Sequence, residues 1–374
     1  MEPFKNLFSS ELIRTFGFHL TKNLTGFERK SFEEELIARL PDLELKERSQ
    51  MIADKLHEIL PMEFGARNQI LLAMLHPDES GFANEGSNED GICGWGVMPM
   101  AELIGQQGLD DFENSLLVLK EMTKRSSSEF GIRYFLKSDP ERAMEVVQTW
   151  ASDDNEHVRR LVSEGTRPKL PWGMRLPAFV EDPSPILPLL TALRDDPEEY
   201  VRRSVANNLN DIAKDHPDLV ADLAVEWMKD ADRNRSKLVR HACRTLIKAG
   251  HARALSAFGI SAPKLKNVEL NVATPTVLLG DNLSFELSLT SDDGEPQDLI
   301  IDYVVHFKKA NGRLAGKVFK WTKFSLSSQE STQLSRAHSI KPITTRVYYP
   351  GEQALSVRIN GEDFCMVTFI LEER

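Results

Sequence analysis

The sequence predicts an all-α helical-repeat solenoid followed by a small all-β sandwich. Over residues 1–260, apolar residues recur at spacings of three and four between short loops that carry Pro, Asp or Gly, which is typical of amphipathic helices. From about residue 266 the apolar residues alternate instead, as they do on strands with one buried face. We therefore expect two domains, 1–260 and 266–374. A chain of 374 residues also suits two domains, because a single core rarely grows that large.

Three helical segments resemble one another and define a repeat. Each carries a Val-Arg pair near the start of a helix whose N-terminal end is acidic: 153–165, 195–214 and 230–250. The paired valines, Val158, Val201 and Val239, are 43 and then 38 residues apart, close to the period of helix-pair repeats. Neither helix of such a pair can bury its apolar stripe without a neighbouring repeat. The pattern therefore predicts a HEAT-like array, a curved wall with a concave side.

The C-terminal part reads as short antiparallel strands. Apolar residues alternate in stretches such as 268–272 and 285–289, and Asn311-Gly312 and Asn360-Gly361 are hairpin signals. We expect seven or eight strands in this part of the chain. A two-sheet sandwich of immunoglobulin-like type is the architecture that such spacing favours.

Composition excludes several classes of protein. No apolar run is long enough to span a bilayer, and the N-terminus lacks the basic start and unbroken apolar stretch of an export signal, so we expect a cytoplasmic protein with no membrane partner. The three cysteines, Cys93, Cys243 and Cys365, are far apart and form no CxxC pair, which argues against a disulfide framework. The nine histidines show no metal-ligand spacing, so we expect no metal and no cofactor.

The charge is acidic overall but unevenly distributed. A formal charge of −11 argues against a nucleic-acid partner unless cations cluster. Arg159-Arg160 and Arg202-Arg203 begin equivalent helices of two repeats, and the third repeat carries four cations that we place on one face of one helix: Lys237, Arg240, Arg244 and Lys248. Stacked repeats would align these sets into a strip suited to a phosphate backbone. The alternative is a set of solvated faces with Arg–Asp pairs between repeats, and charge alone does not decide.

The connection LVSEGTRPKLPWGMRL, residues 161–176, breaks local rules. Glu164 precedes a helix-ending glycine, so its charge lies in the last helical turn, where the helix dipole disfavours it by about 0.3 to 1 kcal/mol. Glu129 stands at the beginning of another helix, and Asp211 falls in the second helix of the next repeat. If second helices line the concave wall, the three acids face one cleft.

Each of these residues also has an ordinary structural interpretation. Glu164 would be a solvated helix-end glutamate, and Glu129 a capping-region acid favoured by the helix dipole. Trp172 would be packed over a loop, and Asp211 would be an exposed acid or one paired with Lys214 or an adjacent arginine. Their joint occurrence in a proline-stiffened connection favours a functional interpretation.

At these residues the sequence resembles the AlkC type of the HEAT-like-repeat DNA glycosylases of alkylation repair. The resemblance lies in segments 129–136 (EFGIRYFL), 157–176, 200–217 and 238–250, and continues in the sandwich at 309–321, 343–351 and 357–362. The first 120 residues match more loosely. The resemblance implies a monofunctional enzyme that hydrolyses the N-glycosidic bond of cationic alkylated bases in duplex DNA, 3-methyladenine above all and 3-methylcytosine as a second candidate.

The resemblance also implies roles for individual residues. Glu164 and Glu129 would stabilise an oxocarbenium-like sugar and orient water, Trp172 would lie against the sugar or lesion, and Asp211 would be a third acid. The lesion would be attacked without base flipping into a deep pocket. Two sets of cations would bind DNA, one on the repeats and one on the sandwich: Arg160, Arg167, Lys169, Arg203, Arg240, Arg244, Lys248, and Lys317 with Lys320. For the sandwich set, a solubilising rim is the alternative.

Two other classes of function remain open at this point. One is a catalytically silent solenoid that binds DNA, and the other is a scaffold for protein interactions, a common use of helical repeats. No lysine stands out as a Schiff-base nucleophile, which argues against an additional lyase activity. We expect a monomer with no obligate protein partner, because a capped solenoid needs none.

Overall fold

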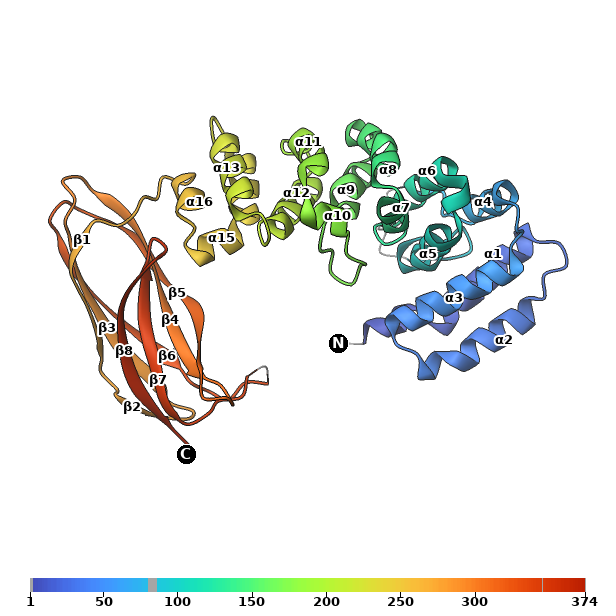
Figure 1. Ribbon diagram of the computed structural model, residues 1–374. Helices are drawn as coiled ribbons and strands as arrows, with labels where there is room; N and C mark the ends of the chain where they lie inside the picture. The colour runs from blue at the N-terminus through green and yellow to red at the C-terminus, as the bar shows by residue number, and fades with distance from the viewer. Residues whose placement is uncertain (1–2, 80–85, 345, 374) are drawn as a thin grey trace. The chain divides into compact units, whose positions relative to one another are not determined.

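The computed structural model describes residues 3–79, 86–344 and 346–373, which run from helices into strands (Figure 1). This order confirms the predicted fold class of helical repeats followed by a two-sheet sandwich. By their contacts the residues group into two compact units. Unit 1 comprises Met1–Asp215 and Asp232–Ala242, and unit 2 comprises His216–Ala231 and Cys243–Arg374. None of the helices described is long and apolar enough to cross a membrane.

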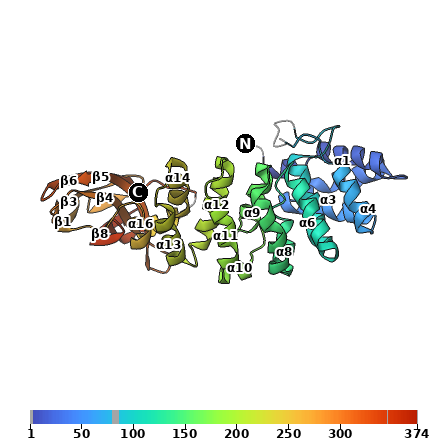
Figure 2. The same ribbon diagram turned by 90° about the horizontal axis from the view of Figure 1, so that it is seen from above.

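Unit 1 is built from helices that pack against their neighbours in the chain. Its α-helices are α1 Ser10–Asn23, α2 Arg29–Arg39, α3 Leu45–Ile59, α4 Phe64–Ala73, α5 Val97–Gln107, α6 Phe112–Thr123, α7 Ile132–Ser138, α8 Pro140–Val147, α9 Glu156–Gly165, α10 Pro177–Glu181, α11 Leu187–Ala192, α12 Glu199–Ile212 and α14 Arg233–Ala242. Short 3-10 helices supplement them: η1 Phe4–Leu7, η2 Leu40–Asp42, η3 Gly94–Gly96, η4 Leu109–Asp111, η5 Gln148–Ser152 and η6 Ser184–Ile186. Seen from above, α6, α8, α9, α11 and α12 follow one another side by side (Figure 2).

The second helix of the third repeat is broken, contrary to the sequence prediction. Helix α14 ends at Ala242, and α15 runs from Arg244 to Ala249. Between them the backbone of the fully buried Cys243 has ψ 6°, far from the helical value near −42°, so the helix is interrupted there. The four cations therefore do not share one helix. Lys237 and Arg240 lie on α14, and the other pair on α15.

Unit 2 combines three helices with the sandwich. The helices are α13 Pro217–Trp227, α15 Arg244–Ala249 and α16 Ala252–Ser256. The strands are β1 Leu265–Val272, β2 Thr276–Leu278, β3 Asn282–Ser291, β4 Gln297–Lys308, β5 Leu314–Leu326, β6 Ser331–Ser339, β7 Gly351–Ile359 and β8 Glu362–Glu372. They form one sheet in the order β1-β3-β6 and another in the order β2-β8-β7-β4-β5. The strand number agrees with the prediction.

Both predicted hairpin turns are present, and one of them meets a helix end. Asn360 and Gly361 have φ of 45° and 88°, the left-handed pair that a two-residue turn between β7 and β8 requires. Gly312, with φ 78°, serves the turn between β4 and β5. A Cβ on Gly250, just after α15, would lie 2.3 Å from the Cα of Gly361. Glycine is therefore needed at both positions for the helix end and the turn to approach.

The sandwich core is aromatic around Tyr303. Phe285 and Trp321 meet edge to face with ring centroids 5.2 Å apart, and Tyr303 lies 5.1 Å from Phe285. Trp321 lies between Lys320 and Lys323 in the sequence, yet it packs against the core. The Tyr303 hydroxyl and His338 Nδ1 are 2.9 Å apart, and both residues are buried.

This buried histidine predicts an acid-sensitive sandwich. Burial, and to a lesser extent Arg346, Arg336 and Lys317, lowers the pKa of His338 from 6.5 to about 4. As the pH falls, His338 therefore takes up its proton in the unfolded chain first, which favours unfolding. The contribution of neutral His338 to the stability of the fold is complete above about pH 6.5 and is lost as the pH falls towards 4. Between pH 6.5 and 4, the free energy of unfolding measured in urea should fall by up to about 3 kcal/mol more for the native protein than for His338→Gln. Parallel pH profiles for the two proteins would contradict this assignment.

Candidate active site

The second helices of two neighbouring repeats, α9 and α12, meet through polar side chains. Arg160, Glu164 and Arg167 follow at intervals of four and three along α9 and the turn after it, so they share one face. Ser204 and Asp211 are two helical turns apart on α12 and also share a face. Because the two helices pack side by side, these faces interlock.

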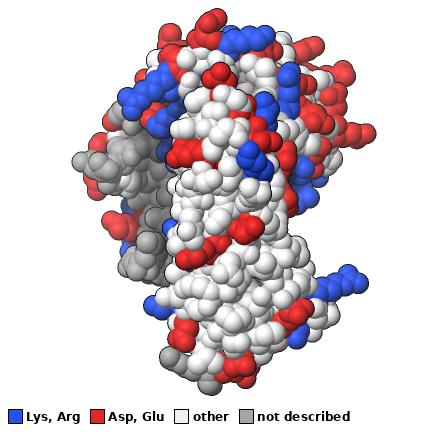
Figure 3. Space-filling model, turned by 90° about the vertical axis from the view of Figure 1, so that its left-hand side faces the viewer, with Lys and Arg blue, Asp and Glu red and all other residues white. Residues whose placement is uncertain are grey.

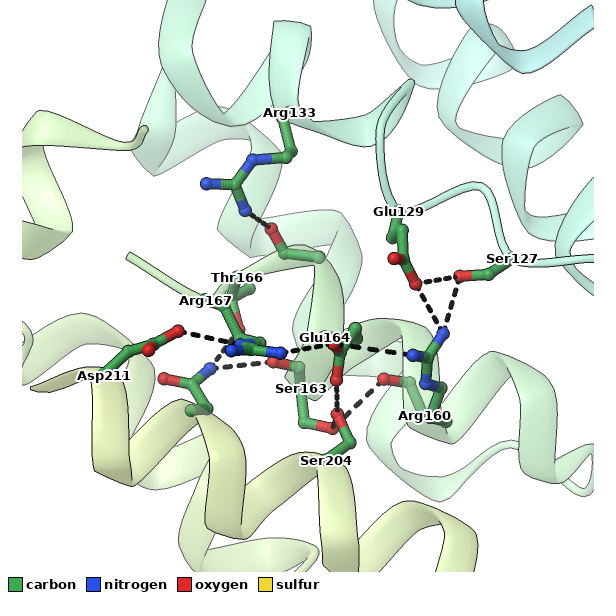
Figure 4. Close-up of polar contacts among 12 residues, drawn as sticks. Ser127, Glu129, Arg133, Arg160, Ser163, Glu164, Thr166, Arg167, Ser204 and Asp211 are labelled. Carbon is green, nitrogen blue, oxygen red and sulfur yellow. Dashed lines mark hydrogen bonds and ion pairs between the residues drawn. The ribbon is translucent and has the colours of Figure 1, made fainter. Parts of the chain in front are cut away.

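An alternating chain of carboxylates and guanidinium groups crosses this interface (Figure 4). Arg160 Nη1 donates to Glu129 Oε2 at 2.6 Å, and its Nη2 lies 3.5 Å from Glu164 Oε1. Arg167 Nη1 donates to the same Glu164 oxygen at 2.6 Å, while its Nε donates to Asp211 Oδ2 at 2.8 Å. The order is Glu129, Arg160, Glu164, Arg167, Asp211, which we call the acid–arginine chain. The structure thus brings the three acids selected from the sequence into one network.

Glu164 is the centre of this chain. Its side chain is 7% exposed, so it is not the solvated helix-end glutamate of the ordinary interpretation. The Ser204 hydroxyl donates to Oε2 at 2.6 Å, while Oε1 receives the arginines. These partners offset the helix-dipole cost of a carboxylate in the last turn of α9.

Asp211, at one end of the chain, is also buried and doubly paired. Besides Arg167 it accepts from Lys214 Nζ at 2.8 Å. Asp211 is therefore a paired acid, bound both by a lysine in the turn after its helix and by an arginine from the adjacent repeat. The chain ties two repeats together at this end.

Both arginines of the chain remain charged. Burial would lower the pKa of Arg160, but Glu129 and Glu164 outweigh it, so the pKa is raised. Burial would also lower the pKa of Arg167, but Glu164 and Asp211 outweigh it, so this pKa is raised as well. The chain therefore contains two charged guanidinium groups, which lie between three carboxyl groups.

Glu129, at the other end of the chain, lies at a hollow. It sits in the turn before α7, three residues ahead of the first helical residue, and Ser127 Oγ donates to its Oε2 at 2.8 Å. A cavity of about 610 Å³, the first hollow, is lined by Glu129, Arg160 and Tyr200 together with the partly exposed Trp95. Glu129 is therefore the acid of the chain that borders a space large enough for a ligand.

Trp172 is outside the acid–arginine chain. It has φ 63°, a conformation that costs a residue with a Cβ about 1 to 2 kcal/mol, and 59% of it is exposed. It lines a second hollow of about 530 Å³, whose wall at Phe130 and Met98 is shared with the first hollow. Trp172 and Glu129 thus border two adjacent spaces.

Arg133 fixes the connection that carries Trp172. This fully buried arginine donates through Nη1 to the Gly165 carbonyl and through Nε to the Met174 carbonyl, both at 2.7 Å. Burial and the nearby Arg167 lower its pKa to about 10, which still leaves it charged at neutral pH. The two ends of the segment are therefore held by one guanidinium group.

The candidate DNA-binding cations fall into two groups. Arg167 is buried and Arg160 half-buried in the acid–arginine chain, and Lys169 pairs with Asp215 at 2.5 Å. The remaining cations are exposed: Arg203, Arg240, Arg244, Lys248, Lys317 and Lys320. On the side shown in Figure 3, the cations of the described residues are interspersed with acids and form no continuous basic patch.

Sequence reasoning missed the polar residues that complete the chain. Ser127, Ser204 and Arg133 each donate to the site or to the connection beside it. Tyr200, whose ring centroid lies 5.1 Å from the Arg160 guanidinium carbon, begins the same face of α12. The spacing of Tyr200, Ser204 and Asp211 places all three on one face of a helix and could have indicated this polar face. The charged residues around them dominate the sequence pattern instead.

Comparison with known proteins agrees with this geometry. A family model described as DNA alkylation repair enzyme matches residues 125–246, the part that holds the acid–arginine chain. A second, described as the C-terminal Ig-like domain of the uncharacterised protein YhaZ, matches residues 266–373. The uncharacterized protein YhaZ of Bacillus subtilis (strain 168) is 36% identical over 364 residues, 97% of each chain.

A solved structure matches over almost the whole length. It is the alkylpurine DNA glycosylase AlkC of Pseudomonas fluorescens, bound to DNA that contains an abasic site analogue. The identity is 34% and the TM-score 0.83, with 99% of this chain and 100% of that chain covered. The fold and the site therefore define a DNA alkylation repair enzyme with a C-terminal immunoglobulin-like domain. Within that class, the chain belongs to the AlkC family.

Proposed function

We propose that this protein is a monofunctional DNA glycosylase that releases cationic N-alkylated bases, 3-methyladenine foremost and 3-methylcytosine second, from duplex DNA. The single observation that carries the proposal is the acid–arginine chain, which ends at the first hollow in a carboxylate. Two guanidinium groups lie between the three carboxylates, and Lys214 pairs with Asp211 at the far end, so the carboxylate nearest the first hollow is that of Glu129. A cationic centre at the Glu129 end would be stabilised.

The chemistry requires stabilisation of a sugar cation rather than an acid. Alkylation makes the base positively charged, so the electron pair of the breaking C1′–N bond neutralises the base as it departs. The sugar is left as an oxocarbenium-like centre, and water adds to C1′ and loses its proton to a carboxylate. In this proposal Glu129 faces the sugar and accepts the proton. Glu164 and Asp211 hold the arginines and add negative potential behind it.

Trp172 supplies an aromatic face beside this centre. Its exposed ring can contact the sugar or the lesion and attract the positive charge through its π face. Because Trp172 and the first hollow lie at the surface of unit 1, the lesion needs no deep pocket to be attacked. Base flipping is therefore not part of this proposal.

DNA binding falls to the exposed cations. Arg203, Arg240, Arg244 and Lys248 on the helices, with Lys317 and Lys320 on the sandwich, are exposed and would contact phosphates. Arg160 and Arg167, which the sequence also suggested for this role, instead organise the acids. We propose that residues 1–260 carry the chemistry and that residues 266–374 add contacts to DNA.

The proposal is tested by incubating the purified protein with methylated duplex DNA and identifying the freed bases by mass spectrometry. We expect 3-methyladenine to be released, and an unbroken phosphodiester backbone at the abasic sites. Salt-sensitive DNA binding without any base release would favour a silent DNA-binding solenoid. Absence of both would favour a protein scaffold.

Trp172 should be dispensable for stability but not for activity. Glycine adopts positive φ without the steric penalty of a Cβ, which stabilises the folded state of the variant. This gain offsets the greater backbone entropy that glycine has in the unfolded chain. Trp172→Gly should therefore change the free energy of unfolding by less than about 1 kcal/mol and slow base release at least about tenfold. Trp172→Phe, which keeps an aromatic face, should retain more activity. Undiminished release by the glycine variant would rule out the proposed contact.

A further inference from the structure

The second hollow has the lining of a site for a flat, polar ring. Its walls include the aromatic residues Phe130, Tyr134 and Trp172, and its volume of about 530 Å³ is within the range of small-molecule sites. Polar groups come from α3 and α5, where Ser49 and Glu102 face the same space. All these residues belong to unit 1.

A hydrogen-bonded chain fixes the polar wall. The Tyr134 hydroxyl donates to Glu102 Oε1 at 2.5 Å, and Gln106 Nε2 donates to the same oxygen at 3.1 Å. Gln106 Nε2 also lies 2.7 Å from Gln50 Oε1. Burial and the carboxylate raise the pKa of Tyr134 to about 12, so its hydroxyl stays protonated and keeps donating. Glu102 is thereby held in one orientation.

Two polar groups of the hollow have no partner. Glu102 accepts only through Oε1, and across residues 3–79, 86–344 and 346–373 no donor or cation contacts Oε2. Ser49 is 2% exposed, and its Oγ likewise has no hydrogen-bond partner among the described side chains and backbone. Glu102 is half-buried, so its Oε2 is an acceptor open to a ligand in this aromatic-lined hollow, whereas the Ser49 hydroxyl is sealed within the wall.

A nucleobase with an exocyclic amino group satisfies this acceptor. Protein carboxylates accept hydrogen bonds from such amino groups, and aromatic side chains stack on base rings. A keto oxygen in the amino position would face the carboxylate as a second acceptor and be disfavoured. The hollow also shares Phe130 and Met98 with the first hollow, where Glu129 lies, so the two spaces are adjacent.

We propose that the second hollow binds the freed amino-bearing base after cleavage, with Glu102 Oε2 accepting from its exocyclic amino group and Trp172 covering the ring. The identity of the base, 3-methyladenine, rests on the proposed function. Glu102 then favours release of amino-bearing lesions over keto lesions, because only an amino-bearing base can donate a hydrogen bond to Glu102 after it leaves the sugar.

The test measures binding of free bases in the absence of DNA. Isothermal titration with 3-methyladenine and with 3-methylhypoxanthine, which carries oxygen in place of the amino group, should show preference for the former. Glu102→Gln should weaken 3-methyladenine binding about tenfold, the usual effect of losing a charged hydrogen-bond partner, and reduce this preference. Glu58→Gln, an exposed change on the α3 helix that also carries Ser49, is the matched control and should bind like the native protein.

The outcomes separate this site from the proposed function. Release of bases from DNA without saturable binding of free 3-methyladenine, or equal affinity in the native protein and Glu102→Gln, would overturn this site alone. Binding of the free base without any release from DNA would support the site and overturn the glycosylase. If Glu102→Gln fails to fold, as judged by thermal unfolding, Tyr134→Phe, which removes the hydroxyl that orients Glu102, provides the same comparison, with weaker 3-methyladenine binding expected and unchanged binding contradicting the site.

Discussion

Glu164→Gln is expected to slow release of 3-methyladenine at least about 100-fold while leaving affinity for undamaged duplex DNA unchanged or slightly higher. Removing one preorganised electrostatic group from an active site commonly costs a factor of this size. The amide keeps the shape of the side chain, and each arginine keeps one carboxylate, because Arg160 retains Glu129 and Arg167 retains Asp211. The fold should therefore survive the change.

A matched control removes an ion pair made by the same helix. Arg159 of α9 pairs with the buried Asp196 at 2.6 Å, outside the acid–arginine chain. Asp196→Asn should lower stability by an amount similar to Glu164→Gln and leave the rate of base release unchanged. Equal rates for Glu164→Gln and the native protein, measured under single-turnover conditions, would remove Glu164 from the mechanism. An equal loss of rate in Asp196→Asn would show that the effect is one of stability.

Arg167→Met is expected to have the largest effect on stability, lowering the free energy of unfolding by about 3 to 5 kcal/mol. The substitution leaves Glu164 without its closest cation and Asp211 with only the half-exposed Lys214. A buried carboxylate that loses its partner keeps its desolvation cost without the compensating attraction. Urea unfolding followed by circular dichroism measures the difference.

Arg203→Met distinguishes this role from phosphate binding. Arg203 is exposed on α12, so its replacement should change stability by less than about 0.5 kcal/mol but weaken DNA binding and reduce its salt dependence. If Arg167 bound phosphate instead, its variant would show that same pattern. Unchanged stability with weakened DNA binding in Arg167→Met would therefore contradict the acid–arginine chain as a structural unit.

The sequence predicts the fold well because hydrophobic periodicity is a local signal. The change of period near residue 266 and the glycines of the two hairpins identify the helical and the sandwich parts. The break at Cys243 is invisible to this reasoning, since no proline or glycine marks it. The inward position of Trp321 is missed for a related reason, because the lysines around it on β5 dominate the local pattern.

The candidate site is predicted only in part. Repeat alignment suggests that Glu129, Glu164 and Asp211 share a region, because it places second helices side by side. It does not show that Arg160 and Arg167 lie between them, since a cation on a helical face looks the same whether it meets a phosphate or a carboxylate of the next repeat. That choice depends on contacts across the repeat interface, which only the folded chain defines.

The most direct test of the account is the single-turnover rate of 3-methyladenine release by the double variant Glu129→Gln/Glu164→Gln, compared with the native protein at saturating enzyme. If fixed negative charge stabilises the sugar that the departing base leaves, the rate should fall further than in Glu164→Gln, towards that of uncatalysed depurination, while the variant still binds the DNA. A rate within a factor of two of the native value would contradict the claim that these carboxylates drive the reaction.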